Sequence, residues 1–150
     1  MITTENILAS AKKTVLAESE AISNLVNYLD DNFVKSVEAI FSSKGRLVVT
    51  GIGKSAIIAQ KIVATLNSTG TPSLFLHASE AIHGDLGMVQ PDDVVICISK
   101  SGNSPEIKVL VPLLKRFNNK LIAITGNITS FLGKEADYTL NTYVEKEACP

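Results

Sequence analysis

Apolar residues are spaced as on one face of an α-helix through the N-terminal part of the chain. The stripe begins at Ile7 and Leu8 and continues to Leu29, which predicts a long helix. Asp30-Asp31-Asn32 then offers a break and an N-cap for a second helix that ends near Phe41. We expect these two helices to form an N-terminal helical hairpin.

After Lys44-Gly45 the pattern changes to short apolar runs that alternate with helical stretches. The candidate strands are Arg46–Thr50, Ser73–Leu76, Val94–Ile98, Leu121–Thr125 and Tyr138–Asn141. The candidate helices between them are Ser55–Asn67, Ser79–Asp85, Pro105–Phe117 and Ser130–Glu135. The run Val94–Ile98 is apolar on both faces, as expected for a sheet with helices on both sides. The alternation predicts an α/β fold with a doubly wound parallel sheet.

The end of the chain leaves this sheet incompletely covered. The charged stretch 145–150 comes directly after the fifth candidate strand, and the long N-terminal helix covers only part of one face. We expect either a closing helix that this sequence lacks or neighbouring subunits to cover the gap.

Composition and charge narrow the class of protein. The 150 residues are 45% hydrophobic and 19% charged, which suits one domain with a sizeable core. A net charge of −1 lacks the basic excess of nucleic-acid binders, so no nucleic-acid partner is expected. No apolar run approaches the ~20 residues of a membrane span, and no signal segment is visible. Cys97 and Cys149 match no metal spacing. These features favour a reduced, cytoplasmic setting away from membranes.

Two loops carry most of the candidate chemistry. The segments 50–55 and 99–104 each follow a candidate strand and lead into a candidate helix. The carboxyl edge of a parallel sheet gathers helix N-termini, whose free N–H groups attract anions. The loops add an ammonium and four hydroxyls, from Lys54, Ser55, Ser99, Ser101 and Ser104. The first prediction is therefore a protein that binds phosphorylated small molecules.

The first loop also invites two nucleotide-binding interpretations. A Walker A loop would need a glycine where this chain has Val48, so that interpretation fails. The dinucleotide pattern G-x-G-x-x-G/A is formally met by Gly51, Gly53 and Ala56. It lacks an acidic residue after the second strand, so NAD stays a distant alternative. A tight turn without a ligand explains the glycines but not Lys54 and Ser55.

The second loop has a simpler explanation that accounts for only part of it. Ser104 before Pro105 is typical of a helix N-cap, and Glu106 would favour the positive end of the helix dipole. That account leaves Ser99, Ser101 and Gly102 unexplained. Gly102 would let the backbone approach a ligand closely, and the hydroxyls would complete a phosphate cradle.

Both histidines lie between the second candidate strand and the third. His77, Glu80, His83 and Asp85 match no zinc spacing, so no metal site is expected. Glu80 and His83 could simply be a helical pair ended by Gly84. His83 nevertheless falls on the same edge as the two loops, where it can exchange protons with a bound substrate.

These motifs together resemble the sugar isomerase (SIS) domain of bacterial arabinose-5-phosphate isomerases. The matching stretches are 50–55 (TGIGKS), 68–73 (STGTPS), 80–88 (EAIHGDLGM), 99–102 (SKSG) and 146–150 (KEACP). The resemblance implies a five-stranded, flavodoxin-like parallel sheet sandwiched by helices, usually in a homotetramer. It implies interconversion of arabinose 5-phosphate and ribulose 5-phosphate through an enediolate, for the octulosonate (Kdo) sugar of lipopolysaccharide or capsule. No cofactor and no metal are implied.

The resemblance also assigns residues. It implies catalytic roles for Lys54, His83, Glu106 and Glu147. It implies phosphate or substrate binding by Gly53, Ser55, Ser99, Ser101, Gly102 and Ser104. Asn103 departs from the family's glutamate, Ala78 from a proline and Ala56 from a glycine.

The resemblance bears on domain organisation as well. Family members continue past Pro150 with further helix, which includes a histidine, and many add nucleotide-sensing CBS modules. We expect residues 1–150 to be a single SIS domain without these parts. A non-catalytic phosphosugar sensor, or an isomerase of a hexulose or heptose phosphate, remains an alternative.

Overall fold

The computed structural model describes residues 3–148 and contains one five-stranded sheet. The strands are β1 (Leu47–Gly51), β2 (Ser73–His77), β3 (Val94–Ile98), β4 (Lys120–Thr125) and β5 (Tyr138–Asn141). All neighbouring pairs are parallel, in the order β2-β1-β3-β4-β5. The predicted α/β fold with a doubly wound, flavodoxin-like sheet is confirmed, and each predicted strand agrees with an observed one to within one residue.

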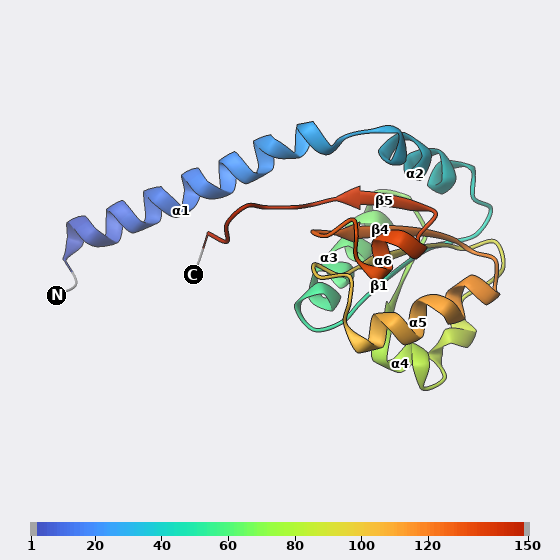
Figure 1. Cartoon of the computed structure of the whole chain (residues 1–150). Coiled ribbons are helices and arrows are strands. Elements are labelled where there is room, and N and C mark those ends of the chain that lie inside the picture. Colours follow the sequence, from blue (N-terminus) through green and yellow to red (C-terminus); the bar gives the residue numbers. More distant parts are fainter. Residues whose placement is uncertain (1–2, 149–150) are drawn as a thin grey trace.

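Helices cover both faces of this sheet (Figure 1). Leu110 and Leu114 of α5 (Pro105–Arg116) pack on one face with residues of α4 (Ala78–Ile82) and α6 (Phe131–Glu135). Ala59 of α3 (Lys54–Ser68) packs on the other face, and Ile40 of α2 (Asp31–Ser42) packs against the same core. Consecutive strand residues enter opposite cores, as Val48 and Val49 do, because side chains alternate along a strand.

The longest helix, α1 (Thr4–Asn24), stands apart from the sheet (Figure 1). It begins where the Thr3 side chain accepts a hydrogen bond from the Asn6 N–H, and it leads through the 3-10 helix η1 (Leu25–Tyr28) to α2. Figure 1 shows α1 running away from α2, on the side toward which the β5 arrow points. The expected hairpin is therefore corrected to two helices that diverge.

The physical reason is that no surface within residues 3–148 covers the apolar stripe of α1. None of its residues is buried, and Val15 in this stripe is 65% exposed. The helices within residues 3–148 include none with the length and apolar character to span a bilayer.

The predicted helix 79–85 is shorter in the structure. It ends at Ile82, and the 3-10 helix η2 (Asp85–Met88) follows. Gly84 lies between them with a φ of 141°, a conformation that interrupts the α-helix.

A buried carboxylate fixes the starts of β1 and β3. The Asp93 carboxylate accepts hydrogen bonds from the Arg46 N–H at 2.7 Å and the Gln90 N–H at 2.9 Å. It also pairs with the Arg46 guanidinium at 3.0 Å. Burial acts to raise the pKa of Asp93, but these hydrogen bonds and the Arg46 charge together hold it below its ordinary value.

We expect Asp93→Asn to lower the free energy of unfolding at pH 7 by about 1–3 kcal/mol, because the charged hydrogen bonds weaken. A lowered pKa adds stability above the unfolded-state value near 4, and that stability is lost as pH falls through the folded-state value. Urea unfolding at pH 7 and pH 3 checks both points. The variant should approach the wild type at pH 3, and an equal difference at both pH values would contradict this account.

Candidate functional site

Four predicted serines surround one cavity at the carboxyl edge of the sheet. Ser55 comes from the first turn of α3, Ser99 and Ser101 follow β3, and Ser104 precedes α5. The cavity has a volume of about 570 Å³ and is completed by Ile52, Lys100, Gly126, Tyr143 and Val144. We call it the serine cavity. The structure therefore brings the two predicted loops together on one side of the molecule.

Hydrogen bonds within the second loop leave its hydroxyl groups as donors. The Gly102 N–H donates to Ser99 Oγ at 3.1 Å, and the Asn103 N–H donates to Ser101 Oγ at 3.3 Å. Each oxygen thus has one lone pair occupied, while its hydrogen is free for an acceptor. Ser104 Oγ is buried and has no hydrogen-bond partner within residues 3–148. Hydroxyls arranged in this way suit a group rich in acceptor oxygens.

The start of α3 adds backbone donors next to the serines. Gly53 is its N-cap residue and has a φ of 58°, which favours glycine. No side chain caps this helix end, so its first N–H groups face outward with the positive end of the dipole. The cavity therefore combines neutral donors with a partial positive charge.

Gly102 packs closely against the start of α6. It is buried with a φ of 63°, and a Cβ there would lie 2.0 Å from Ser130 Oγ. Gly102 thus approaches the N-cap residue of α6 closely, and its contact with a ligand stays a prediction. The Leu132 N–H also donates to the Gly102 carbonyl at 3.0 Å.

Asn103, which differs from the family's glutamate, was not among the predicted site residues. Its Oδ1 accepts a hydrogen bond from the Phe131 N–H at 3.0 Å, and its Nδ2 donates to the Ser101 carbonyl at 3.2 Å. Asn103 therefore ties the serine loop to α6. The one sequence signal for Asn103 is its position next to Gly102, because asparagine beside glycine is typical of a loop.

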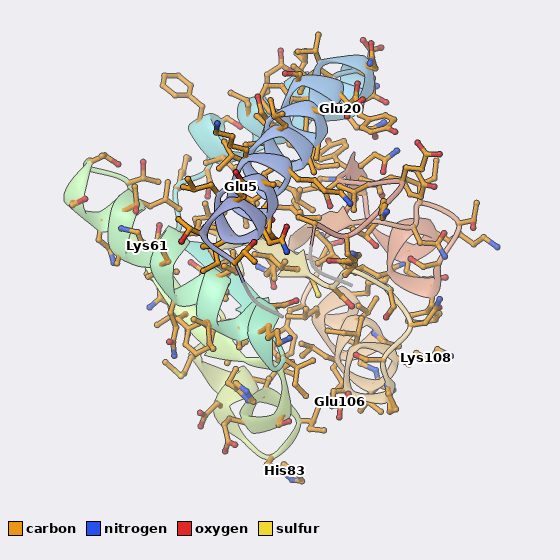
Figure 2. All side chains as sticks on the ribbon, turned by 90° about the vertical axis from the view of Figure 1, so that its left-hand side faces the viewer. Glu5, Glu20, Lys61, His83, Glu106 and Lys108 are labelled. Carbon is orange, nitrogen blue, oxygen red and sulfur yellow. The ribbon has the colours of Figure 1, made fainter. Side chains whose placement is uncertain are left out.

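The predicted catalytic residues do not gather at the serine cavity. Lys54 is the exposed first residue of α3, Glu106 lies in the first turn of α5 and His83 follows α4. Figure 2 shows Glu106 and His83 well below α1 in that view. None of the three lines the cavity.

Glu147 is the one predicted catalytic residue with a link to the cavity. Its carboxylate pairs with the ammonium of Lys100, and Lys100 lines the cavity. Lys100 lies between Ser99 and Ser101 in the sequence and was not among the predicted site residues. The adjoining Cys149 and Pro150 of the matching stretch lie outside the described residues.

The Cys97 thiol and the His77 ring also lie near this edge of the sheet, and their surroundings do not suggest a catalytic role. Burial raises the pKa of the Cys97 thiol to about 12, which excludes it as a nucleophile at neutral pH. The His77 ring lies edge-on to Phe75 at 6.3 Å, and its buried Nδ1 has no partner within residues 3–148. Across the same residues no group of three His, Cys, Asp or Glu side chains is arranged to hold a metal ion.

A known family matches the part of the chain that contains the sheet and the serine loops. The SIS domain family matches residues 40–149, well over half of the chain. This chain belongs to the SIS domain family.

Relatives of the whole chain support the same family. The arabinose 5-phosphate isomerase KdsD of Escherichia coli K12 is 52% identical over 141 residues, which cover 93% of this chain and 43% of KdsD. This SIS chain thus spans less than half the length of that curated relative. The E. coli CFT073 protein c3406, solved in complex with arabinose 5-phosphate, superposes with a TM-score of 0.92 at 39% identity. That match covers 98% of this chain and 78% of c3406.

We expect Gly102→Ala to destabilise the SIS domain by about 1–3 kcal/mol, because alanine must strain its φ and displace Ser130. Thermal unfolding measures the effect. Gly87→Ala is the matched control, since no atom lies within 4 Å of a Cβ there and its φ is not positive. Equal losses in both variants would show that Gly102 has no special packing role.

Proposed function

We propose that this SIS domain binds arabinose 5-phosphate and interconverts it with ribulose 5-phosphate. The observation that carries the proposal is the convergence of Ser55, Ser99, Ser101 and Ser104 on one cavity at a helix N-terminus. Free hydroxyls and backbone N–H groups are the donors that a phosphate group needs. The names of the relatives, KdsD among them, favour a pentose phosphate within that class.

The reaction moves one proton between neighbouring carbons. A base removes the proton at C2 of the open-chain aldose, and the resulting enediolate is protonated at C1 while a proton is transferred between the oxygens. The conversion is redox-neutral, so this route requires no redox cofactor. Phosphate binding at the serine cavity fixes the far end of the sugar and lowers the entropic cost of alignment.

We assign the proton transfers to residues that lie outside the lining of the serine cavity. The ammonium of Lys54 is suited to stabilise the enediolate or the phosphate charge. Glu106 and Glu147 are the candidate proton carriers, and His83 is the candidate for ring opening or proton shuttling. The exposure of Lys54 and His83 at the same edge of the sheet supports these assignments.

Ketose formation from arabinose 5-phosphate tests this function. Lys54→Ala and His83→Ala should each lower kcat, and Ser104→Ala should raise KM by about 10- to 100-fold through one lost bond to a charged group. Ser68→Ala is the control, because that hydroxyl bonds only within its own helix, to the Thr65 carbonyl. Near wild-type rates in both Lys54→Ala and His83→Ala would end this role assignment.

A binding measurement separates the enzyme from a sensor. The proposed enzyme should bind arabinose 5-phosphate and exchange the C2 proton with solvent. Binding without exchange would instead favour the phosphosugar sensor, and the absence of binding would contradict both.

We further propose that the domain acts in the cytoplasm as a homotetramer. The support is the uncovered apolar stripe of α1, in which Ile7, Leu8, Val15 and Ile22 are each more than half exposed. A stripe of this size on a helix without its own core is typical of an interface between subunits. The proposed reaction would supply the Kdo sugar of lipopolysaccharide or capsule.

Leu8→Glu should shift the protein toward smaller species, because each buried leucine contributes about 1.5–3 kcal/mol and a buried charge opposes assembly. Light scattering coupled to size-exclusion chromatography measures the mass. Lys13→Glu, an exposed charge on the same helix, should leave it unchanged. A monomeric wild type would contradict the tetramer.

A further inference from the structure

The residues after β5 form one wall of the serine cavity. We call residues 142–148 the C-terminal segment. Its start is fixed, because the Thr142 N–H donates to the Thr125 carbonyl and the Tyr143 N–H to Asn141 Oδ1, both at 2.9 Å. Tyr143 and Val144 line the serine cavity and also a second cavity of about 700 Å³ beside α1. The C-terminal segment thus separates the serine cavity from the cavity beside α1.

Past Tyr143, one polar contact ties the C-terminal segment to the rest of residues 3–148. This contact is the ion pair between the Glu147 carboxylate and the Lys100 ammonium. The backbone of Lys100 is held firmly, since its carbonyl accepts hydrogen bonds from the Gly126 N–H at 3.0 Å and from Thr125 Oγ1 at 3.2 Å. Of the two partners in this ion pair, Glu147 is therefore the one that can move away.

Lys100 is also the only charged residue among the described residues that line the serine cavity. Its side chain is 61% exposed and that of Glu147 is 66% exposed, so the pair is screened by water and weak. A phosphate dianion in the cavity carries more charge and more acceptor oxygens than one carboxylate. It therefore competes with Glu147 for the same ammonium.

We propose that Lys100 is a positioning residue that passes from the Glu147 carboxylate to the phosphate group when a phosphosugar binds. The exchange frees Glu147 and the C-terminal segment only when a substrate is present. Lys100 thereby links phosphate recognition at one end of the sugar to proton transfer at the other. This inference rests on the proposed function, because it requires the serine cavity to bind phosphate.

Trypsin cleavage after Lys146, followed by mass spectrometry on the full chain, reports release of the C-terminal segment. Saturating inorganic phosphate should speed wild-type cleavage about two- to fivefold, the range that an exposed ion pair supports. Lys100→Met should be cleaved faster without phosphate and should not respond to it. Lys100→Arg should restore the response. Cleavage after Lys12 normalises each rate, in buffers matched for ionic strength with chloride.

Calorimetry with inorganic phosphate supplies the second measurement. Glu147→Gln should bind phosphate about two- to fivefold more tightly than wild type, because the competitor is gone, and Lys100→Met should bind more weakly. Lys108→Met, an exposed lysine on α5 outside the cavity, is the matched control (Figure 2).

The outcomes separate the two proposals. If phosphate binds but cleavage after Lys146 does not accelerate, or if Glu147→Gln binds no more tightly, the exchange at Lys100 is overturned while the phosphate site stands. If the wild type binds no phosphate, the proposed function and the exchange are both overturned.

Discussion

The parallel pairing of β1 with β3 places both serine loops at one point of the sheet edge. Gly51 is in register with Ile98, so the two strands end at the same level and their following loops start side by side. Every residue of both strands is buried, and a slip by one position would turn the residues of one core toward the other. The carboxylate of Asp93 fixes the opposite ends of the same strands through the Arg46 N–H. The position of the cavity is therefore set by the interior of the protein.

The second loop depends on support from outside the β1–β3 pair. The N–H groups of Gly102 and Asn103 orient the serine hydroxyls, and both residues are held by α6 through Leu132 and Phe131. The end of β4 holds Lys100 through its carbonyl. The proposed anion binding at this edge thus relies on β4 and α6, although neither supplies a predicted binding residue.

Local sequence patterns predicted the features that depend on neighbouring residues. Continuous apolar runs such as Val94–Ile98 marked the strands, and Ser104 before Pro105 marked a helix start, because burial and capping act over a few residues. The contact of Gly102 with Ser130 joins residues far apart in the chain, and no local pattern encodes it. The divergence of α1 from α2 was missed for a related reason. An apolar stripe predicts that a helix will be covered but does not say by which chain.

The separation of the predicted catalytic residues from the serine cavity agrees with the geometry of the proposed substrate. Phosphate is carried on C5, whereas the reacting carbons C1 and C2 are at the opposite end of the sugar. Under the proposed function, groups that act on these carbons therefore belong outside the serine cavity, where Lys54, His83 and Glu106 lie. The helix α1 projects beyond the same carboxyl edge of the sheet (Figure 1). A second chain packed against the apolar stripe of α1 would lie next to this edge, so under the proposed function assembly and chemistry would depend on the same helix.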